Sequence, residues 1–226
     1  GATNEWAQSV EIRAESLRTY AFKDAPVDWQ PVSGEWKVTN RWECDPRWSF
    51  FSGVQRQSPA CLWSKRQHGD NITVEFFVGP KMDRSRGKWY EYAADFNAVI
   101  CADGKDISSG YSFMFGGWND RGSQIVRGRE IVAENRRIVI PRKSSTHRRW
   151  FHVKLRKRGK QLTFWVDGAR VGSVRDEKPL TGNRFGLWTW DNGIMVAQVR
   201  VATDGQMASV GMDSPPNPRP KTPYDK

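Results

Sequence analysis

The residues best suited to chemistry lie in one alternating stretch at positions 89–100, which reads WYEYAADFNAVI. Alternate side chains of a β-strand point to opposite faces, so this stretch predicts one apolar face and one polar face. The polar face carries an aromatic, acidic and amide row: Trp89, Glu91, Asp95 and Asn97. Carboxylate and amide oxygens accept hydrogen bonds from sugar hydroxyls, and an indole stacks on a pyranose ring. The pattern therefore favours a concave carbohydrate-binding face, with a merely solvated outer face as the alternative.

A second stretch, residues 71–78, has the same alternation and places Glu75 on its polar face. Glycosidases need two carboxyl groups, one on each side of the scissile bond. Glu75 and Glu91 are therefore candidates for a catalytic pair on neighbouring strands, and Asp95 is a third candidate. The separation of their oxygens decides between this role and that of an ordinary exposed carboxylate.

Turn residues and period-two alternation predict about a dozen short strands and no amphipathic helix. Besides the two stretches above, strands are expected at residues 10–13, 48–53, 60–65, 110–117, 123–133 and 137–140. Asp191-Asn192-Gly193 predicts a turn between two further strands within residues 184–203, because Asn and Gly tolerate positive φ. This pattern indicates an all-β protein, a two-sheet antiparallel sandwich or jelly roll.

The most regular segment, residues 150–176, predicts a three-strand antiparallel meander. Gly159 and Gly168 lie between its alternating runs and supply the turn conformations. One face of the meander should be buried, through Phe151, Val153, Leu162, Phe164 and Val166.

The chain divides by composition near residue 204. Residues 1–204 suit a single β-sandwich domain, which at this size can bury a proper core. Residues 205–226 are rich in Gly, Ser and Pro, and proline opposes a closing strand. They are expected to form a tail that either wraps the domain or leads to another segment.

The formal net charge is +11, and the segment from Arg142 to Lys160 contains no Asp or Glu. This balance favours an anionic partner, such as an acidic or sulfated polysaccharide, with plain solubility as the alternative. Nucleic acid ranks last, because the interleaved aromatic and basic motifs of single-strand binders are missing. No apolar run approaches the roughly 18 residues of a membrane span.

Metal, cofactor and redox signals are weak. The three cysteines, Cys44, Cys61 and Cys101, show no Cys-x-x-Cys spacing. We expect them to be buried thiols, and the alternative is that two of them form one disulfide. The three histidines are too scattered for a metal triad, so no cofactor is expected, and a structural Ca²⁺ in a loop stays open. The polar opening after Gly1 fits a removed export signal, so the expected location is extracellular or periplasmic.

Six short motifs occur in a fixed order over residues 34–203: Gly34-x-Trp36-x-Val38, Asp70 to Phe76, Trp150-x-His152-Val153, Val166-Asp167-Gly168, Phe185 to Thr189, and Val199-Arg200-Val201. This order resembles the concanavalin A-like (laminin-G-like) lectin and glucanase sandwiches, near the 3-keto-disaccharide hydrolase group. The resemblance implies a two-sheet antiparallel jelly roll and a carbohydrate-binding, glycoside hydrolase-like function on a poly- or oligosaccharide. The alternative is a non-catalytic adhesion or scaffolding module with a protein partner.

In related sandwiches the loops at one edge reach over the ligand groove. The resemblance therefore adds binding candidates at that edge: Trp188, Trp190, Asp191 and Asn192, with Trp63, Trp118 and Arg127 as further members. The alternative for Trp188 and Trp190 is that both indoles pack under the C-terminal tail. Laminarinase-type members carry Glu-x-Asp-x-x-Glu, and the nearest match here begins at Glu43. It places Trp48 at the acid/base position and Pro46 inside the strand, which argues against that mechanism.

Overall fold

The computed structural model describes residues 18–20, 29–39, 50–81, 94–143, 145–146, 149–204 and 220–225 of the 226-residue chain. The first strands are β1 (Arg18–Tyr20), β2 (Trp29–Ser33), β3 (Glu35–Thr39), β4 (Phe50–Gln67), β5 (Ile72–Pro80), β6 (Phe96–Ala102) and β7 (Tyr111–Phe115). They are followed by β8 (Ser123–Arg127), β9 (Glu130–Asn135), β10 (Phe151–Arg158), β11 (Gln161–Val166), β12 (Ala169–Arg175) and β13 (Arg184–Thr203). Two short helical turns, η4 (Ile107–Ser109) and α2 (Gly117–Asp120), lie among them.

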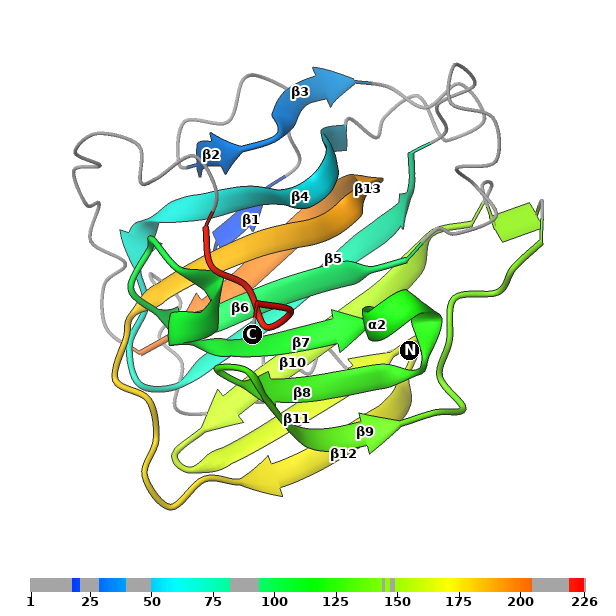
Figure 1. Cartoon of the computed structure of the whole chain (residues 1–226). Coiled ribbons are helices and arrows are strands. Elements are labelled where there is room, and N and C mark those ends of the chain that lie inside the picture. The colour runs from blue at the N-terminus through cyan, green and yellow to red at the C-terminus, as the bar shows by residue number, and fades with distance from the viewer. Residues whose placement is uncertain are drawn as a thin grey trace, which may run out of the picture.

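The strands form two packed layers that belong to one continuous hydrogen-bonded sheet (Figure 1). Along its main path the strand order is β12-β11-β10-β5-β13-β6-β7-β8-β9, and β4 pairs with β13 while also pairing with β2 and β3. Strand β13 is 20 residues long; its first part pairs with β6 and its last part with β5. It therefore passes from one layer into the other.

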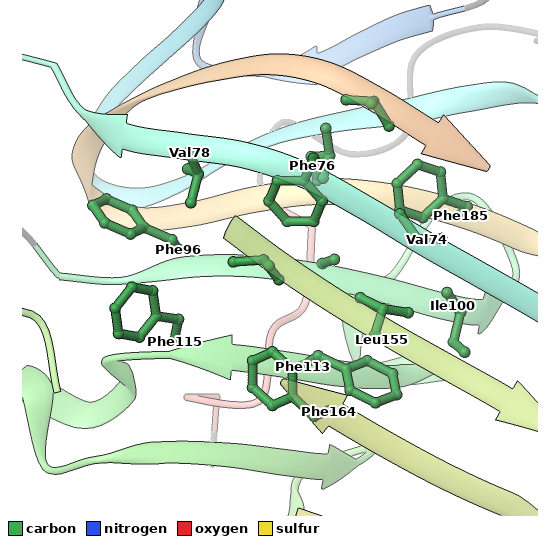
Figure 2. Packing of buried hydrophobic residues seen from close by; sticks show 14 of the residues in the cluster. Val74, Phe76, Val78, Phe96, Ile100, Phe113, Phe115, Leu155, Phe164 and Phe185 are labelled. Atoms are coloured by element: carbon green, nitrogen blue, oxygen red, sulfur yellow. The ribbon is translucent and has the colours of Figure 1, made fainter. Parts of the chain in front are cut away.

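The hydrophobic core lies between the two layers (Figure 2). The Phe113 ring of β7 packs edge-on against Phe164 of β11, with centroids 5.6 Å apart, and Phe115 packs against Phe151 of β10 at 5.0 Å. Such edge-to-face pairs add to the stabilisation from burial of their apolar area. The predicted fold class, an all-β antiparallel sandwich, is confirmed.

The predicted meander is also confirmed, as strands β10, β11 and β12. The five side chains expected on its buried face are at most 4 % exposed: Phe151, Val153, Leu162, Phe164 and Val166. Period-two alternation succeeded here because one face of the meander covers the core and the other faces outward.

The predicted turn at Asp191-Asn192-Gly193 is wrong, because β13 continues through it. Asp191 has a φ of 47°, and the pairing with β4 shifts register between Trp190 and Asn192. The Asp191 Oδ1 atom accepts a hydrogen bond of 2.8 Å from the backbone N–H of Gln57, on the facing strand. The residues that favour a turn form a β-bulge instead, which bends the strand without ending it.

Other strand boundaries also differ from expectation. The separate strands expected at 48–53 and 60–65 are parts of the single strand β4. The stretch 123–133 is a hairpin, β8 and β9, which turns at Gly128 with a φ of 65°. Residues 137–140 are not a strand, and the strand expected at 10–13 lies outside the described residues.

Cys61 and Cys101 are free, buried thiols, while Cys44 lies outside the described residues. In the part of the chain that the structure describes, no helix has the length and apolar character needed to cross a membrane.

His68 is buried just after β4 and connects that strand to β6. Its Nε2 atom accepts a hydrogen bond of 3.1 Å from the backbone N–H of Cys101, and its Nδ1 atom lies 2.7 Å from the Gly69 carbonyl oxygen. These partners require a neutral ring with the proton on Nδ1, because Nε2 is used as an acceptor. Burial, as the largest cause, lowers the pKa of His68 to about 4.

We expect His68 to make the fold sensitive to mild acid. The unfolded histidine binds a proton below about pH 6.5, whereas the folded one resists protonation, so stability is lost as the pH falls from 6.5 toward 4. Urea unfolding should show a loss on the order of 2–3 kcal/mol between pH 6.5 and 4.5 from this group. The His68→Gln variant should be less stable at pH 7 but show a flatter pH dependence. An unchanged slope would contradict this assignment.

Candidate functional site

The outer face of the layer that contains β6 carries a row of side chains set by strand register. Trp188 of β13 is paired with Asn97 of β6, Asn97 with Met114 of β7, and Met114 with Gln124 of β8. Residues paired across antiparallel strands point to the same face, so these four side chains lie side by side. Phe96 and Ala98, the neighbours of Asn97 along β6, point the other way into the core.

A second row lies two residues along the same strands. Gly186 of β13 is paired with both Trp63 of β4 and Val99 of β6, and Val99 is paired with Ser112 of β7. We call the surface made by the polar and indole members of both rows the Asn97 face: Trp63, Asn97, Ser112, Gln124 and Trp188.

The Asn97 face contains several side-chain nitrogen and oxygen atoms that have no hydrogen-bond partner among the described residues. Within those residues, hydrogen-bond partners are lacking for Trp63 Nε1, both Asn97 amide atoms, Ser112 Oγ, Gln124 Oε1 and Trp188 Nε1. All five side chains are at most 1 % exposed. Each buried polar group without a partner costs about 1–3 kcal/mol, and native proteins contain few of them. Their presence together on adjacent strands therefore distinguishes this face from the rest of the described sandwich.

Asp95 lies at the edge of this face, immediately before β6, and is buried. Its Oδ1 atom accepts hydrogen bonds from the backbone N–H of Trp190 at 2.8 Å and from Thr189 Oγ1 at 3.2 Å, and its Oδ2 atom accepts one from the Tyr224 hydroxyl. Burial raises the pKa of Asp95, and the bonds from Tyr224 and Trp190 partly oppose that effect. The nearby Asn97 amide opposes it too, although it does not reach hydrogen-bond geometry.

Three indoles surround Tyr224, which belongs to the C-terminal segment Pro220–Asp225. Ring centroids lie 4.9 Å from Trp118, 5.4 Å from Trp190 and 6.0 Å from Trp188. The Tyr224 hydroxyl also accepts a hydrogen bond of 3.2 Å from the backbone N–H of Trp118. The segment, red in Figure 1, runs across the sheet near β6 and β7 and so lies on the Asn97 face.

The turn that presents Trp118 has an unusual backbone. Trp118, Asn119 and Asp120 have φ values of 52°, 57° and 61°, a left-handed conformation that is unfavourable for residues other than glycine. The Asp120 carboxylate stabilises the turn by accepting a hydrogen bond of 2.9 Å from the backbone N–H of Ile140. Strained backbone of this kind clusters at functional sites, and here it places an indole against Tyr224.

The structure brings together most of the residues that sequence reasoning selected. Gathered at or beside the Asn97 face are Asp95, Asn97, Trp63, Trp118, Trp188, Trp190 and Asn192. Asn192 belongs to this group because its Nδ2 atom lies 3.5 Å from the Asp95 carbonyl oxygen. Trp89 and Glu91 lie outside the described residues.

Three selected residues lie elsewhere. Glu75 points outward from the other layer, where its carboxylate is 3.1 Å from Arg200 and 3.5 Å from His152. Arg127 binds Asp176 at 2.8 Å and the Lys178 carbonyl oxygen at 3.0 Å. Asp191 is exposed at the bulge in β13. The core separates Glu75 from Asp95, so these two carboxylates cannot act on one bond.

Sequence reasoning did not select Ser112, Gln124 or Tyr224. Ser112 lies between Tyr111 and Phe113 on β7, and Gln124 precedes the core residue Ile125 on β8, which was a usable signal for an outward-facing position. Tyr224 follows Pro223 in the tail, where no periodicity assigns a face. Among the described residues, no three His, Cys, Asp or Glu side chains gather closely enough to hold a metal ion.

Comparison with known proteins identifies the fold. No family model matches the chain, and no curated protein matches it by sequence. Solved structures do match: carbohydrate-binding module CBM66 from Bacillus subtilis is 18 % identical, with a TM-score of 0.54 over 78 % of this chain and 96 % of that one. The Ca²⁺/Man2-bound exoplasmic/lumenal domain of VIP36 is 9 % identical, with a TM-score of 0.55 over 90 % of this chain and 92 % of that one. The apo Crh5 transglycosylase is 12 % identical, with a TM-score of 0.52 over 84 % and 85 %.

The chain therefore has the fold of lectin-like β-sandwiches, in agreement with its resemblance to the concanavalin A-like group. The narrower relation to the 3-keto-disaccharide hydrolase group stays a prediction.

We expect Asp95 to be required for stability. The Asp95→Ala variant leaves the Trp190 N–H and the Tyr224 hydroxyl without their acceptor, so the free energy of unfolding should fall by about 2–4 kcal/mol. Asp95→Asn keeps one acceptor oxygen and should lose less. Urea denaturation measures both, with Asp191→Ala as a control at an exposed carboxylate that accepts a bond from a single backbone N–H. Equal losses in the Asp95→Ala and Asp191→Ala variants would contradict this role.

Proposed function

We propose that this chain is a carbohydrate-binding domain and that the Asn97 face is its binding site. The observation that carries the proposal is the group of buried, unused hydrogen-bonding atoms on that face, set among the indoles of Trp118, Trp188 and Trp190. Sugar-binding sites combine these two features, because a pyranose presents an apolar ring face and a rim of hydroxyls. The fold supports the proposal, since it is shared with a carbohydrate-binding module.

The donors and acceptors of the face suit hydroxyl groups. The indole N–H groups of Trp63 and Trp188 donate, whereas the Asn97 amide and the Ser112 hydroxyl both donate and accept. A sugar hydroxyl also does both, so one hydroxyl can bond to any of these groups. The members of the face are uncharged, which favours a neutral pyranose at this position.

The described residues favour binding over hydrolysis. A second carboxylate near this face, Glu134, lies 3.5 Å from the Gln124 amide. It pairs with Arg136 at 2.8 Å and with Arg121 at 3.0 Å, and these hydrogen bonds lower the pKa of Glu134. A carboxylate held ionised in this way is a poor general acid. Hydrolysis through Asp95 and Glu91 stays a proposal, which a reducing-end release assay tests.

The surface favours a glycan over a protein partner. Among the described residues, Val139 is the large apolar side chain that is exposed, at 39 %. A protein-binding module is expected to expose a contiguous apolar patch. We further propose an extracellular or periplasmic location, which the similarity to an exoplasmic/lumenal domain supports.

We expect Asn97→Leu to separate binding from stability. Leucine has nearly the same size and removes two buried atoms that lack partners, so the free energy of unfolding should stay unchanged or rise, by up to about 1–3 kcal/mol. Affinity for the binding member of a panel of cello-, laminari-, xylo- and mannohexaose should fall at least about tenfold, because lost hydrogen bonds are each worth about 1 kcal/mol or more. Urea unfolding and isothermal titration calorimetry measure the two effects.

Gln161→Leu is the matched control for that variant. Gln161 lies on the other layer, where its amide donates to Ser173 Oγ at 2.7 Å. Its replacement should leave glycan affinity unchanged. A stability loss in Asn97→Leu with intact affinity would show that Asn97 is structural and would remove it from the site.

An anionic polysaccharide would find a second contact surface on the other layer. Lys154 and Arg156 of β10 lie over the Trp165 ring at 5.2 and 5.0 Å, next to the exposed Arg158 and Lys160. These cations belong to the segment that contains no acidic residue. Their attraction for a sulfated or uronic chain is long-ranged and is screened over about 8–10 Å at physiological salt.

Binding to heparin should therefore weaken clearly when ionic strength rises from low to physiological, whereas binding to a neutral hexasaccharide should barely change. Replacing both Lys154 and Arg156 with Gln should reduce the salt dependence for heparin alone. Titrations of each ligand at two salt concentrations provide the measurement. If the binding of both ligands is insensitive to salt, the basic segment is only a solvated surface and does not bind an anionic glycan.

A further inference from the structure

We propose that the segment Pro220–Asp225 is a built-in competitor for the Asn97 face, occupying the position of a sugar ring and leaving when a glycan binds. This inference rests on the function proposed above for that face. It assigns to the tail a role that composition alone, which indicated a wrapping tail or a linker, does not give.

The contacts of Tyr224 imitate those of a bound sugar. A six-membered ring lies among three indoles, with centroids 4.9 to 6.0 Å away. Its hydroxyl donates to Asp95 and accepts from the Trp118 N–H, which is the paired donor and acceptor use typical of a sugar hydroxyl. Aromatic rings and carboxylates in lectin sites serve the same two purposes, stacking and hydroxyl recognition.

The rest of the segment makes few hydrogen bonds to the described part of the sandwich. Within the described residues, its backbone bonds to the sandwich are a 3.2 Å bond from Ser108 N–H to the Lys221 carbonyl oxygen and a 3.4 Å bond from Lys221 N–H to Asp106. Bonds within the segment include the 3.0 Å bond from Asp225 N–H to the Thr222 carbonyl oxygen. Pro220 and Pro223 have no N–H to donate, and residues 220–225 form a turn in place of a strand. Pro220, Thr222 and Pro223 are buried, so packing holds the segment together with Tyr224, whose hydroxyl makes the bonds to Asp95 and to the Trp118 N–H.

The segment also covers the face without satisfying it. Among the residues that the structure describes, Asn97, Ser112 and the indole N–H groups of Trp63 and Trp188 have no partner while Tyr224 is in place. A permanent part of the core would be expected to satisfy such groups, because each costs about 1–3 kcal/mol when buried alone. The Tyr224 hydroxyl is already bonded to Asp95 and the Trp118 N–H, and Thr222 Oγ1 accepts from the Tyr224 N–H. A glycan has further hydroxyls to offer the unpartnered groups, so exchange of the segment for a glycan gains hydrogen bonds.

An internal competitor lowers the apparent affinity, which equals the intrinsic affinity multiplied by the fraction of molecules whose site is free. Weakening the competitor must therefore tighten glycan binding, which is the opposite of what loss of a ligand contact does. The sign of this change separates a competitor from a residue of the binding site.

The first experiment replaces Tyr224 in the full chain. We expect Tyr224→Ala to bind its glycan from the cello-, laminari-, xylo- and mannohexaose panel about 10- to 100-fold more tightly than the wild type, and Tyr224→Phe to show an intermediate gain. Lys221→Ala is the matched control, because Lys221 is exposed and its bonds to the described part of the sandwich use its backbone atoms. Weaker or unchanged binding in both Tyr224 variants would overturn the proposal.

The second experiment needs no glycan. A fluorescein-labelled peptide with the sequence of residues 220–226, PKTPYDK, should bind the full-length Tyr224→Ala protein saturably in fluorescence anisotropy and bind the wild type more weakly. The peptide PKTPADK should not bind. Failure of PKTPYDK to bind the folded variant, checked by urea unfolding, would overturn the competitor. If the peptide binds but no sugar of the panel does, the segment is displaceable as proposed. In that case only the assignment of a glycan to the Asn97 face is overturned.

Discussion

Strand β13 holds the two layers of the sandwich together, because it hydrogen bonds to neighbours in both. Its first part aligns Trp188 with Asn97 on β6, and its last part aligns Val201 with Val74 on β5. Between them the bulge at Asp191 redirects the strand. The backbone N–H of Trp190, next to that bulge, bonds to Asp95 at 2.8 Å. The strand that closes the fold therefore also fixes the carboxylate, the amide and two indoles of the candidate site relative to one another.

The candidate site is built on strands, and this has an energetic consequence. Strands β6, β7 and β8 hold Asn97, Ser112 and Gln124 at fixed register, so these groups cannot turn toward solvent when no ligand is bound. The fold carries the cost of their burial, and rigid placement of polar groups is what a selective site requires. The extensive aromatic core on the other side of the same strands offsets that cost.

Much of this architecture could be predicted from the sequence, and the failures have physical reasons. Alternation identified the inward and outward residues of β6 and β10, because each strand has one face on the core. It could not tell on which layer an outward residue lies, and for that reason Glu75 was placed among the catalytic candidates with Glu91 and Asp95. The sequence correctly indicated a positive φ near Asp191, but it did not distinguish a turn from a β-bulge. Only the pairing of β13 with β4 distinguishes these two structures. Tyr224 was missed because its role comes from tertiary contacts of a segment without periodicity.

The cluster of Trp118, Trp188 and Trp190 around Tyr224 also gives the molecule an optical reporter. Aromatic rings held at fixed angles in a chiral environment produce near-ultraviolet circular dichroism, and indole emission depends on the groups that touch the ring. Tyr224 is the ring that all three indoles share, at interplanar angles of 62°, 76° and 52°. The molecule thus carries, without added labels, a spectroscopic record of whether its C-terminal segment is seated on the sheet.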